Sequence, residues 1–273
     1  MIKLGISTSI LDNKNEIEKL LPFAPEVIEF YNYPAKELKK ILDFCDKHNI
    51  KPALHTPLPW EKELKRFMPT GPGRELFQEA LDMTEITIKC AAEIDALHVV
   101  VHFPSPIGLG IPEGRDAIDR FLNPIAEHSV RLGVRVLIEN VSPNPDFFSP
   151  EHYLSILERY NPLEFCLDIG HAHLLDPTCK VEDFINTIGK KIRSAHIYNT
   201  HVLRYKAYGH EPIEEQQSEE TGWINIPRTF ELLKRKANLE VIILEYGDLW
   251  INKKDPESIR FHTEKIKRLL END

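Results

Sequence analysis

The sequence lacks the features that would place it in a membrane or in an oxidising compartment. No window of the 273 residues approaches 18 consecutive apolar residues, so we expect no membrane span and no membrane partner. Only four cysteines occur, and none forms a C-x-x-C pair, which is typical of reduced, buried thiols. The opening stretch MIKLGISTSI contains no long apolar run and no small-residue cleavage site. Together these absences predict a cytoplasmic protein.

An excess of positive charge is also missing. The 43 acidic residues outnumber the 34 Lys and Arg residues and give a net charge of −9. Proteins that bind nucleic acid use clustered Lys and Arg to neutralise phosphates, so nucleic acid is not expected as a partner. The hydrophobic fraction of 42% and the charged fraction of 28% indicate an ordinary globular chain with a large core. The composition leaves open whether the protein is a monomer or a homo-oligomer.

Two kinds of nucleotide-binding loop are absent, and so is any linker that would divide the chain. Neither G-x-G-x-x-G nor G-x-x-x-x-G-K-[ST] occurs, and the first apolar run leads into GISTS rather than a glycine-rich turn. This argues against a doubly wound open sheet, which is the main alternative for alternating strands and helices. No stretch rich in Pro, Gly or Ser interrupts the sequence, so we predict one domain over residues 1–273.

Short apolar runs recur along the chain, and amphipathic helical patterns separate them. Several runs are β-branched, such as VVVHF and EVIILEY, which is typical of strands buried on both faces. Between two of them, SPEHYLSILERY offers Ser149 as a helix cap and Pro150 as the first helical residue. The alternation predicts an α/β fold, a single (β/α)₈ barrel whose active site lies at the C-terminal ends of the strands. The predicted strands are 3–7, 26–31, 51–56, 97–103, 134–141, 164–169, 192–199 and 240–246.

Nearly every predicted strand carries a side chain able to bind metal near its C-terminal end. Converging buried carboxylates repel one another and must be neutralised, so a purely structural role does not explain them. The polar residues are Glu29, His55, His102, Glu139, Asp168, His196 and Glu245. Residues two positions earlier share their face, and these are all apolar or small, as a packed barrel interior requires. They are Val27, Ala53, Val100, Leu137, Cys166, Ser194 and Ile243.

A divalent cation is the simplest way to neutralise this acidic group. The residues expected to hold it are Glu139, Asp168, His196 and Glu245. Three carboxylates and one imidazole suit Mn²⁺, Mg²⁺ or Co²⁺. Adding His55 and His102 favours Zn²⁺ and allows a second ion. In the stretch EFCLDIGHAH, Asp168 then ends a strand as a ligand, and His171 faces the substrate or a further metal.

Other side chains near the same end are candidates for substrate binding. Glu29, His55 and His102 line the predicted mouth, where they contact substrate or metal or serve only as structure. Arg204, in the loop after the seventh strand, is placed to hold an anionic group such as a phosphate. Trp60, in the loop after the third strand, is expected to overhang the mouth as an aromatic wall.

The remaining histidines are expected to have structural roles or to lie on the surface. His98 shares a face with His102 but lies four residues towards the barrel bottom, which indicates a structural histidine. Four others fall in helical patterns and are predicted to lie on helix surfaces, namely His48, His128, His152 and His262.

The motifs VVVHF, VLIEN, CLDIGHAH, SAHIYN and IILEY together resemble those of the xylose-isomerase-like barrel superfamily, and the resemblance runs essentially end to end. This superfamily includes sugar isomerases and epimerases, inosose dehydratases and the endonuclease IV type of abasic-site endonuclease. The resemblance to its epimerase-like members implies that one metal is bound by Glu139, Asp168, His196 and Glu245. It also implies that the two glutamates move protons and that His171 hydrogen-bonds the substrate.

The resemblance to the endonuclease IV type implies a different metal content. Members of that type hold three zinc ions, with further ligands that match His55, His102 and His171 and with an Asp-x-His motif after the seventh strand. The best match to that motif here is YGH, in which Tyr208 replaces the aspartate and His210 remains a candidate metal ligand. The missing aspartate and the acidic net charge both favour the epimerase-like reading.

The residues therefore support two enzymatic hypotheses. The first is a metal-dependent isomerase or epimerase of carbohydrate metabolism, which acts on a small sugar, sugar phosphate or keto-polyol by an enediolate-type proton transfer. Its catalytic residues are expected to be Glu139, Glu245 and His171. The second is a zinc-dependent phosphodiesterase that acts on abasic DNA. A non-catalytic sugar-binding or scaffold barrel is a third reading, and the intact set of four ligands argues against it.

Overall fold

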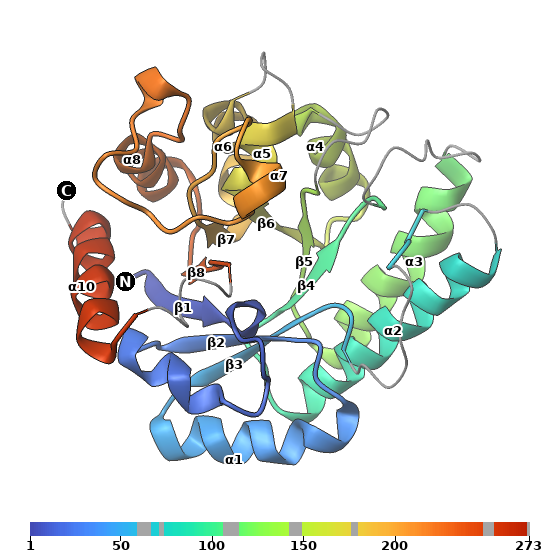
Figure 1. The fold of residues 1–273 in the computed structure, drawn as a ribbon. Coiled ribbons are helices and arrows are strands. Elements are labelled where there is room, and N and C mark those ends of the chain that lie inside the picture. Colours follow the sequence, from blue (N-terminus) through green and yellow to red (C-terminus); the bar gives the residue numbers. More distant parts are fainter. Residues whose placement is uncertain are drawn as a thin grey trace.

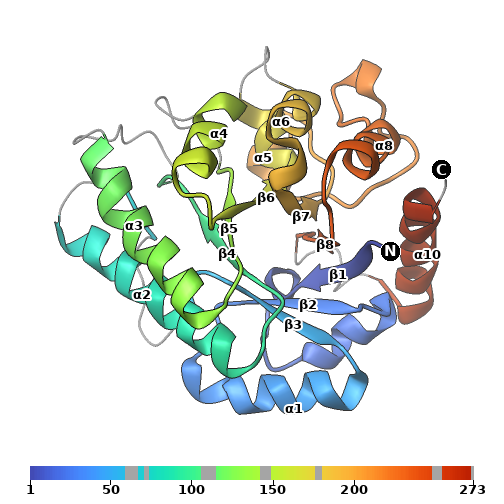
Figure 2. The same cartoon turned by 180° about the vertical axis from the view of Figure 1, so that it is seen from behind.

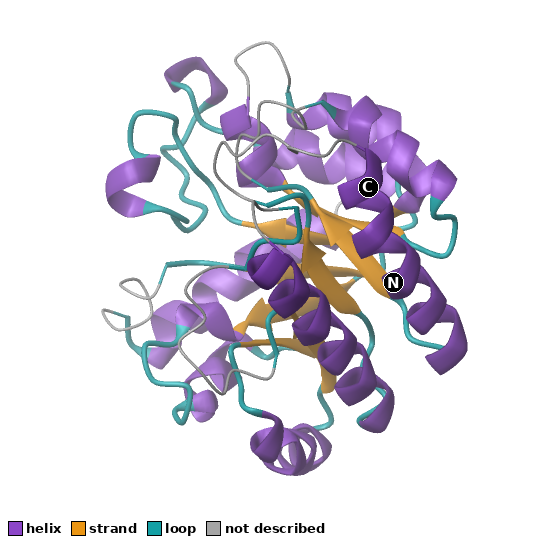
Figure 3. Ribbon diagram, turned by 90° about the vertical axis from the view of Figure 1, so that its right-hand side faces the viewer, coloured by secondary structure: helices purple, strands orange, loops and turns teal. Residues whose placement is uncertain are grey.

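The computed structural model describes residues 1–58, 67–70, 74–105, 115–141, 149–175, 180–247 and 254–271. Eight parallel strands pair in chain order, and the last strand pairs with the first, so the sheet is a closed barrel. Helices surround the strands on the outside, as Figures 1 and 2 show from opposite sides. Figure 3 shows the strands enclosed by helices from a third direction. The predicted single (β/α)₈ barrel is confirmed.

Each strand coincides with one of the predicted apolar runs, and most are one to four residues shorter than the run. The shortening is expected because strand pairing stops where the chain turns into the loops of either barrel end. The strands are β1 (Lys3–Ser7), β2 (Val27–Tyr31), β3 (Lys51–His55), β4 (Val99–His102), β5 (Val136–Glu139), β6 (Glu164–Asp168), β7 (Ile192–Ile197) and β8 (Val241–Leu244).

The helices alternate with the strands, and short 3₁₀ turns accompany them. The α-helices are α1 (Leu38–His48), α2 (Arg74–Glu93), α3 (Arg115–Leu132), α4 (Pro150–Arg159), α5 (Ile169–Leu175), α6 (Val181–Ile188), α7 (Tyr205–Tyr208), α8 (Ile226–Lys236) and α10 (Pro256–Glu271). The 3₁₀ turns are η1 (Thr8–Ile10), η2 (Ile17–Phe23), η3 (Ala35–Glu37), η4 (Gly189–Lys191) and η5 (Glu219–Thr221). Helix α4 begins at Pro150 with Ser149 as its cap, as predicted. None of the helices in the described ranges combines the length and apolar character needed to cross a membrane.

The apolar core has two parts. The larger part lies between the outer face of the sheet and the helices, and side chains such as Phe165 and Phe184 fill it. The smaller part fills the barrel interior in two clusters, one formed by Val27, Ala53, Val241 and Ile243 and the other by Val100, Leu137 and Cys166. All seven residues of the predicted interior layer are fully buried. Gly5 leaves room for this packing, since a Cβ atom there would clash with Ile243 Cδ1.

The cysteines fit the prediction of reduced thiols. Cys45, Cys90 and Cys166 are buried and free. Cys179 lies outside the described residues.

Candidate metal centre

The C-terminal ends of β3 to β8 bring the predicted ligands together. Neighbouring parallel strands align their ends, and the register places His102 beside Glu139 and Asp168 beside His196. Each of these side chains follows an apolar residue that packs against the helices, so the strand alternation turns the polar residue into the barrel. The predicted mouth is therefore built by strand register rather than by the loops.

Glu139 lies at the centre of the site and is fully buried. Its Oε2 atom lies 3.0 Å from Nε2 of His55 and 3.0 Å from Nε2 of His102. Its Oε1 atom faces the other way and lies 3.3 Å from Nδ1 of His196. The two oxygens of one carboxylate thus face two separate groups of donors.

The second group contains the rest of the predicted ligand set. Nδ1 of His196 lies 3.3 Å from Oε2 of Glu245 and 3.9 Å from Oδ2 of Asp168. Glu139 Oε1, Asp168 Oδ2 and His196 Nδ1 are buried, and none of them makes a hydrogen bond. Burying polar atoms without partners costs free energy, so three such atoms facing one another fit a bound cation.

Three groups of three donor residues in the described ranges have the spacing of a metal site, with ligand atoms within 4.8 Å of one another. Two of them share Glu139 and correspond to the two sides of its carboxylate. The groups are His55, His102 and Glu139; Glu139, Asp168 and His196; and Glu29, His55 and His196.

Backbone carbonyls fix the orientation of three imidazoles around the mouth. A carbonyl oxygen only accepts hydrogen bonds, so the Nδ1 atom facing it carries a proton, and in the neutral ring Nε2 keeps its lone pair. The donor and carbonyl pairs are His55 with Thr56 (2.7 Å), His171 with Asn140 (3.0 Å) and His210 with Glu245 (2.9 Å). In the neutral form these histidines can bind a metal or accept a hydrogen bond through Nε2, and in the protonated form Nε2 donates a hydrogen bond instead.

Asp168 is held by two residues that the sequence analysis did not identify. Its Oδ1 atom accepts hydrogen bonds from the Tyr198 hydroxyl (2.8 Å) and from the backbone N–H of His171 (2.6 Å). The Asn140 side chain donates to the Asp168 carbonyl (2.8 Å) and accepts from its backbone N–H (2.9 Å). Only Oδ2 remains for a metal. Asn140 and Tyr198 closely follow predicted ligands in VLIEN and SAHIYN, and this proximity in the sequence could have identified them.

His210 reaches the cluster from the long loop after β7. Residues 199 and 211 form an isolated antiparallel bridge that brings this loop back over the barrel. The His210 ring stacks on Tyr198 with a centroid distance of 3.7 Å and an interplanar angle of 6°. Its centroid lies 6.0 Å from that of His171. Tyr208, at the position of the missing aspartate, is 57% exposed.

Carboxylates and imidazoles shift each other's pKa values across the site. Burial opposes ionisation, but His102 and His196 lower the pKa of Glu139 well below its usual range, and His196 lowers that of Glu245 to about 2. Burial also opposes protonation of His171, but Asp168 and Glu139 raise its pKa to about 9. The pKa of Asp168 is raised by burial and by Glu139. Without a metal, protons on the imidazoles supply the positive charge.

The other predicted site residues differ in their surroundings. Glu29 is fully buried between His98 and His196. The Arg204 guanidinium donates two hydrogen bonds to Glu211, at 3.0 and 2.9 Å, and anion binding there stays a prediction. Trp60 lies outside the described residues.

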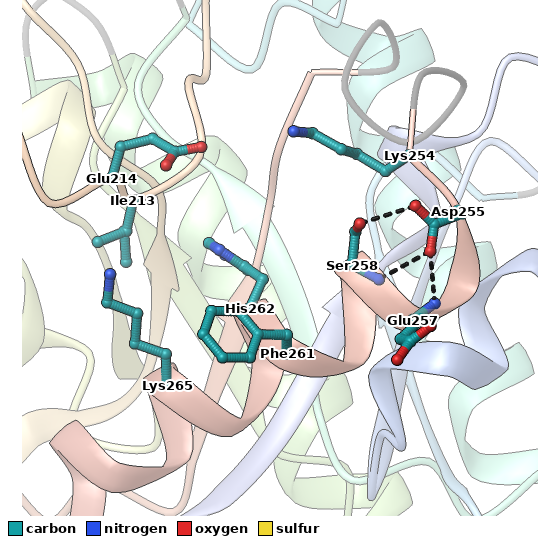
Figure 4. A pocket seen from close by; sticks show the side chains of 9 residues that line it. All are labelled: Ile213, Glu214, Lys254, Asp255, Glu257, Ser258, Phe261, His262 and Lys265. Carbon is teal, nitrogen blue, oxygen red and sulfur yellow. Dashed lines mark hydrogen bonds between the residues drawn. The ribbon is translucent and has the colours of Figure 1, made fainter.

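A surface pocket of about 480 Å³ lies away from this cluster, beside α10. None of its nine lining residues is a predicted ligand, as the close view in Figure 4 shows. Its His262 was predicted to lie on a helix surface, which is wrong, because the residue is buried and its Nε2 forms a 2.8 Å hydrogen bond with the buried Tyr246 hydroxyl. Burial lowers the pKa of His262 to about 4 and keeps it neutral. The other three helical histidines are half-buried.

Comparisons with known proteins agree with this architecture. Residues 17–267 match the family described as xylose isomerase-like TIM barrel. A curated protein named probable endonuclease 4, from Carboxydothermus hydrogenoformans, is 27% identical over 172 residues, which are 62% of this chain and 58% of that protein. The chain therefore spans less than two thirds of that relative's length.

Solved structures show the same fold at low sequence identity. The structure of L-ribulose 3-epimerase is 17% identical, with a TM-score of 0.73, and the match covers 99% of this chain and 95% of that one. The IolI protein, whose structure contains a zinc atom, is 16% identical, with a TM-score of 0.74 and 98% of each chain covered.

Proposed function

This chain belongs to the xylose isomerase-like TIM barrel family, and we propose that it is a divalent-metal-dependent isomerase or epimerase of a small sugar, sugar phosphate or keto-polyol. The observation that carries the proposal is the convergence of four predicted ligands, three of which have a buried donor atom without a hydrogen-bond partner. The solved epimerase with the same fold supports this class of substrate.

The donor atoms fit a hard divalent cation. Glu139 Oε1, Asp168 Oδ2 and Glu245 Oε2 supply three oxygens around His196 Nδ1. Oxygen-rich sets of this kind suit Mn²⁺, Mg²⁺ or Co²⁺. When bound, the ion would act as a Lewis acid towards a substrate carbonyl and its neighbouring hydroxyl.

Two glutamates are placed to move protons. Their lowered pKa values keep both carboxylates ionised at neutral pH, which is the state that a general base needs. Glu245 is 9% exposed and Glu139 is fully buried, with its Oε2 facing two imidazoles. We therefore assign the first proton abstraction, from the carbon beside the carbonyl, to Glu245. Glu139 would return a proton on the opposite face, which gives epimerisation.

His171 is the residue best placed to bind the substrate. Its Nδ1 atom faces Asn140 and Asp168 inside the barrel, so its Nε2 atom is available to a ligand. With a pKa of about 9, the ring carries a positive charge at neutral pH and can donate to a substrate oxygen.

A second candidate function is a zinc phosphodiesterase. One observation favours it, namely that His55 and His102 both direct Nε2 at Glu139 Oε2 and form a second donor group next to the first. Two imidazoles and one carboxylate are a typical set for catalytic zinc. The relative named probable endonuclease 4 supports this candidate, whereas the net charge of −9 opposes binding of a polyanion.

One pair of assays tests the proposal. Metal-loaded protein is incubated with a panel of ketoses and keto-polyols in D₂O, and NMR follows deuterium entering next to the carbonyl. The same protein is incubated with duplex DNA that carries an abasic site, with and without EDTA. We expect deuterium exchange, about one Mn²⁺-type ion per chain and no useful nicking. EDTA-sensitive nicking at catalytic protein concentrations, with two or more zinc ions per chain, would instead establish the second candidate.

Each assay needs a control for contaminating enzymes. Asp168→Asn keeps the size of the side chain and removes one anionic ligand, so protein prepared in the same way should lose the exchange. Exchange that persists in this variant at the wild-type rate would contradict the proposal.

A further inference from the structure

One buried carboxylate is not used by the proposed reaction. Glu29, in the middle of β2, is fully buried. Its Oε2 atom lies 3.2 Å from Nε2 of His98, and its Oε1 atom lies 3.0 Å from Nε2 of His196. Both of these partners are imidazoles, and both are buried inside the barrel. Glu29 therefore faces the back of a predicted metal ligand and has no exposure to the space where a substrate would bind.

His196 is oriented differently from the other histidines of the site. His55, His171 and His210 give their Nδ1 proton to a backbone carbonyl and turn Nε2 towards the mouth. His196 instead directs Nδ1 at the carboxylates of the metal centre and Nε2 at Glu29. A neutral imidazole carries one proton, and a nitrogen that binds metal must be bare. The proton of a metal-bound His196 must then reside on Nε2, where Glu29 is the acceptor.

We propose that Glu29 is a positioning residue for the metal centre. It accepts the Nε2 proton of His196 and so directs the Nδ1 lone pair at the metal, while His98 holds the second oxygen of Glu29. A carboxylate behind a metal-bound imidazole fixes the ring and raises its basicity as a ligand. The inference rests on the metal centre of the proposed function, but it does not depend on which reaction that centre catalyses. It assigns Glu29 a role other than the predicted substrate contact.

A metal ion held directly by Glu29, His55 and His196 is the competing interpretation, because these residues have the required spacing. The contacts of the group argue against it. His55 directs Nδ1 at the Thr56 carbonyl and Nε2 at Glu139, and His98 occupies Oε2 of Glu29. His196 Nδ1 faces Glu139 and Glu245, so only Glu29 Oε1 and His196 Nε2 face each other here without hydrogen bonds, and two donors are too few for a protein metal site.

The test measures metal affinity rather than turnover. Glu29→Gln keeps the shape and one acceptor oxygen, whereas Glu29→Leu removes both acceptors. Glu26→Gln is the matched control, because it removes a negative charge from an exposed residue just before the same strand. For each protein, the Mn²⁺ and Co²⁺ dissociation constants are measured by competition with a chromogenic chelator. The visible absorption spectrum of the Co²⁺ form and the unfolding temperature of the metal-free form are recorded alongside.

We expect Glu29→Gln to weaken metal binding about 10-fold and Glu29→Leu about 100-fold, the scale found for residues that support a ligand. The Co²⁺ absorption bands should shift in both variants, and Glu26→Gln should match the wild type in affinity and spectrum. A residue with a merely structural role would change the unfolding temperature but not the spectrum of the bound Co²⁺. His98→Gln, which leaves Glu29 in place, should show a smaller loss of affinity and provides a second test if the Glu29 variants fold poorly.

Two outcomes overturn the inference. Unchanged affinity and spectrum in both Glu29 variants would show that His196 needs no support from Glu29. Loss of one whole equivalent of metal, with the remaining ions bound as in the wild type, would make Glu29 a ligand. A wild-type protein that binds no divalent metal would instead refute the metal centre itself, so the two failures are distinguishable.

Discussion

The two ends of the barrel both gather charged side chains from neighbouring strands, but they balance the charge differently. At the N-terminal end, two guanidinium groups and two carboxylates from the starts of β5 to β8 form a closed ring of ion pairs. The ring consists of Arg135, Glu164, Arg193 and Glu240, with N···O distances from 2.5 to 3.5 Å. Arg stays protonated at any physiological pH, so this ring is neutral without help from solution.

At the C-terminal end, the acids face imidazoles instead. Glu139 meets His55, His102 and His196, and Glu245 meets His196 and His210. An imidazole is cationic only while it holds a proton, so the positive charge at this end is conditional. A metal can replace those protons, whereas nothing at the other end needs replacing. The difference agrees with the general division of such barrels into a stabilising bottom and a functional mouth.

The largest expected effect comes from the residue shared by both donor groups of the mouth. Glu139→Gln removes the charge that faces both sides, so we expect metal affinity and turnover each to fall about 100-fold or more. The unfolding temperature of the metal-free protein should change little, since a buried charge is removed together with the protons that balanced it. Isothermal titration with Mn²⁺ and the exchange assay measure the two effects. If Glu139→Gln bound metal with wild-type affinity, Glu139 would not be a ligand of the metal centre.

A second substitution separates metal binding from proton transfer within the mouth. Glu245→Gln should weaken metal binding and also lower turnover at saturating metal by about 10²-fold or more, the usual scale for a lost general base. Exchange of the substrate proton with solvent on the remaining face is expected to outlast epimerisation. NMR in D₂O reports both processes in one sample.

His171→Gln is the control for this prediction. It should leave the metal content unchanged and reduce substrate binding or turnover. If Glu245→Gln epimerises at the wild-type rate once metal is restored, Glu245 is only a ligand, and the base has to be sought at Glu139 or His171.

The residues of the C-terminal mouth could be predicted from the sequence, because the side chains of a strand alternate between its two faces. Strand alternation and the position of each polar residue at the end of an apolar run placed Glu139, Asp168 and His196 at one mouth. The hydrogen bonds of Asn140 and Tyr198 to Asp168 could not be predicted, because they depend on register between strands about 30 residues apart. The alternation indicates which side of a strand a residue occupies, but not which atom of its neighbour it faces.

The ring of ion pairs at the N-terminal end, called the bottom ring below, was not predicted for the same reason. Arg135 and Glu240 are 105 residues apart, and each stands at the start of a strand, where charged residues are ordinary. The pairing of Arg204 was also not predicted, although its partner Glu211 lies only seven residues away in the same loop. Such pairing inside a loop has no periodic signal, because loops do not repeat.

A substitution in the bottom ring should lower the free energy of unfolding and leave the metal affinity unchanged. Arg193→Met removes the partner of Glu164 and Glu240 at a position where the side chain is 27% exposed. Because the site is neither fully buried nor fully exposed, we expect a loss of about 1–2 kcal/mol in the free energy of unfolding. Urea denaturation measures it, and metal affinity should equal that of the wild type.

Arg235→Met provides the matched control on α8. Its partner Glu231 is 66% exposed, so the change should stay within about 0.5 kcal/mol. If the two substitutions cost the same, the ring adds nothing beyond an ordinary surface pair.

The last prediction concerns the difference in pH response between the two ends. In the metal-free protein the pKa of His171 is raised from its usual 6.5 to about 9 by Asp168 and Glu139, against the opposing effect of burial. Its contribution to stability is therefore fully present below pH 6.5 and is lost as the pH rises towards 9. Metal binding is expected to have the opposite trend, because the ion would replace protons on the mouth imidazoles and each displaced proton strengthens binding about tenfold per pH unit.

Thermal unfolding at pH 6, 7.5 and 9, with and without Mn²⁺, separates these contributions. The metal-induced rise in the unfolding temperature should grow from pH 6 to pH 9 at a fixed metal concentration. The destabilisation caused by Arg193→Met should stay constant over the same range, because neither Arg nor Glu titrates there. A metal effect independent of pH would mean that protons on the imidazoles do not balance the mouth carboxylates. The two ends of the barrel would then differ in geometry alone, and the conditional charge described for the mouth would have no consequence for metal binding.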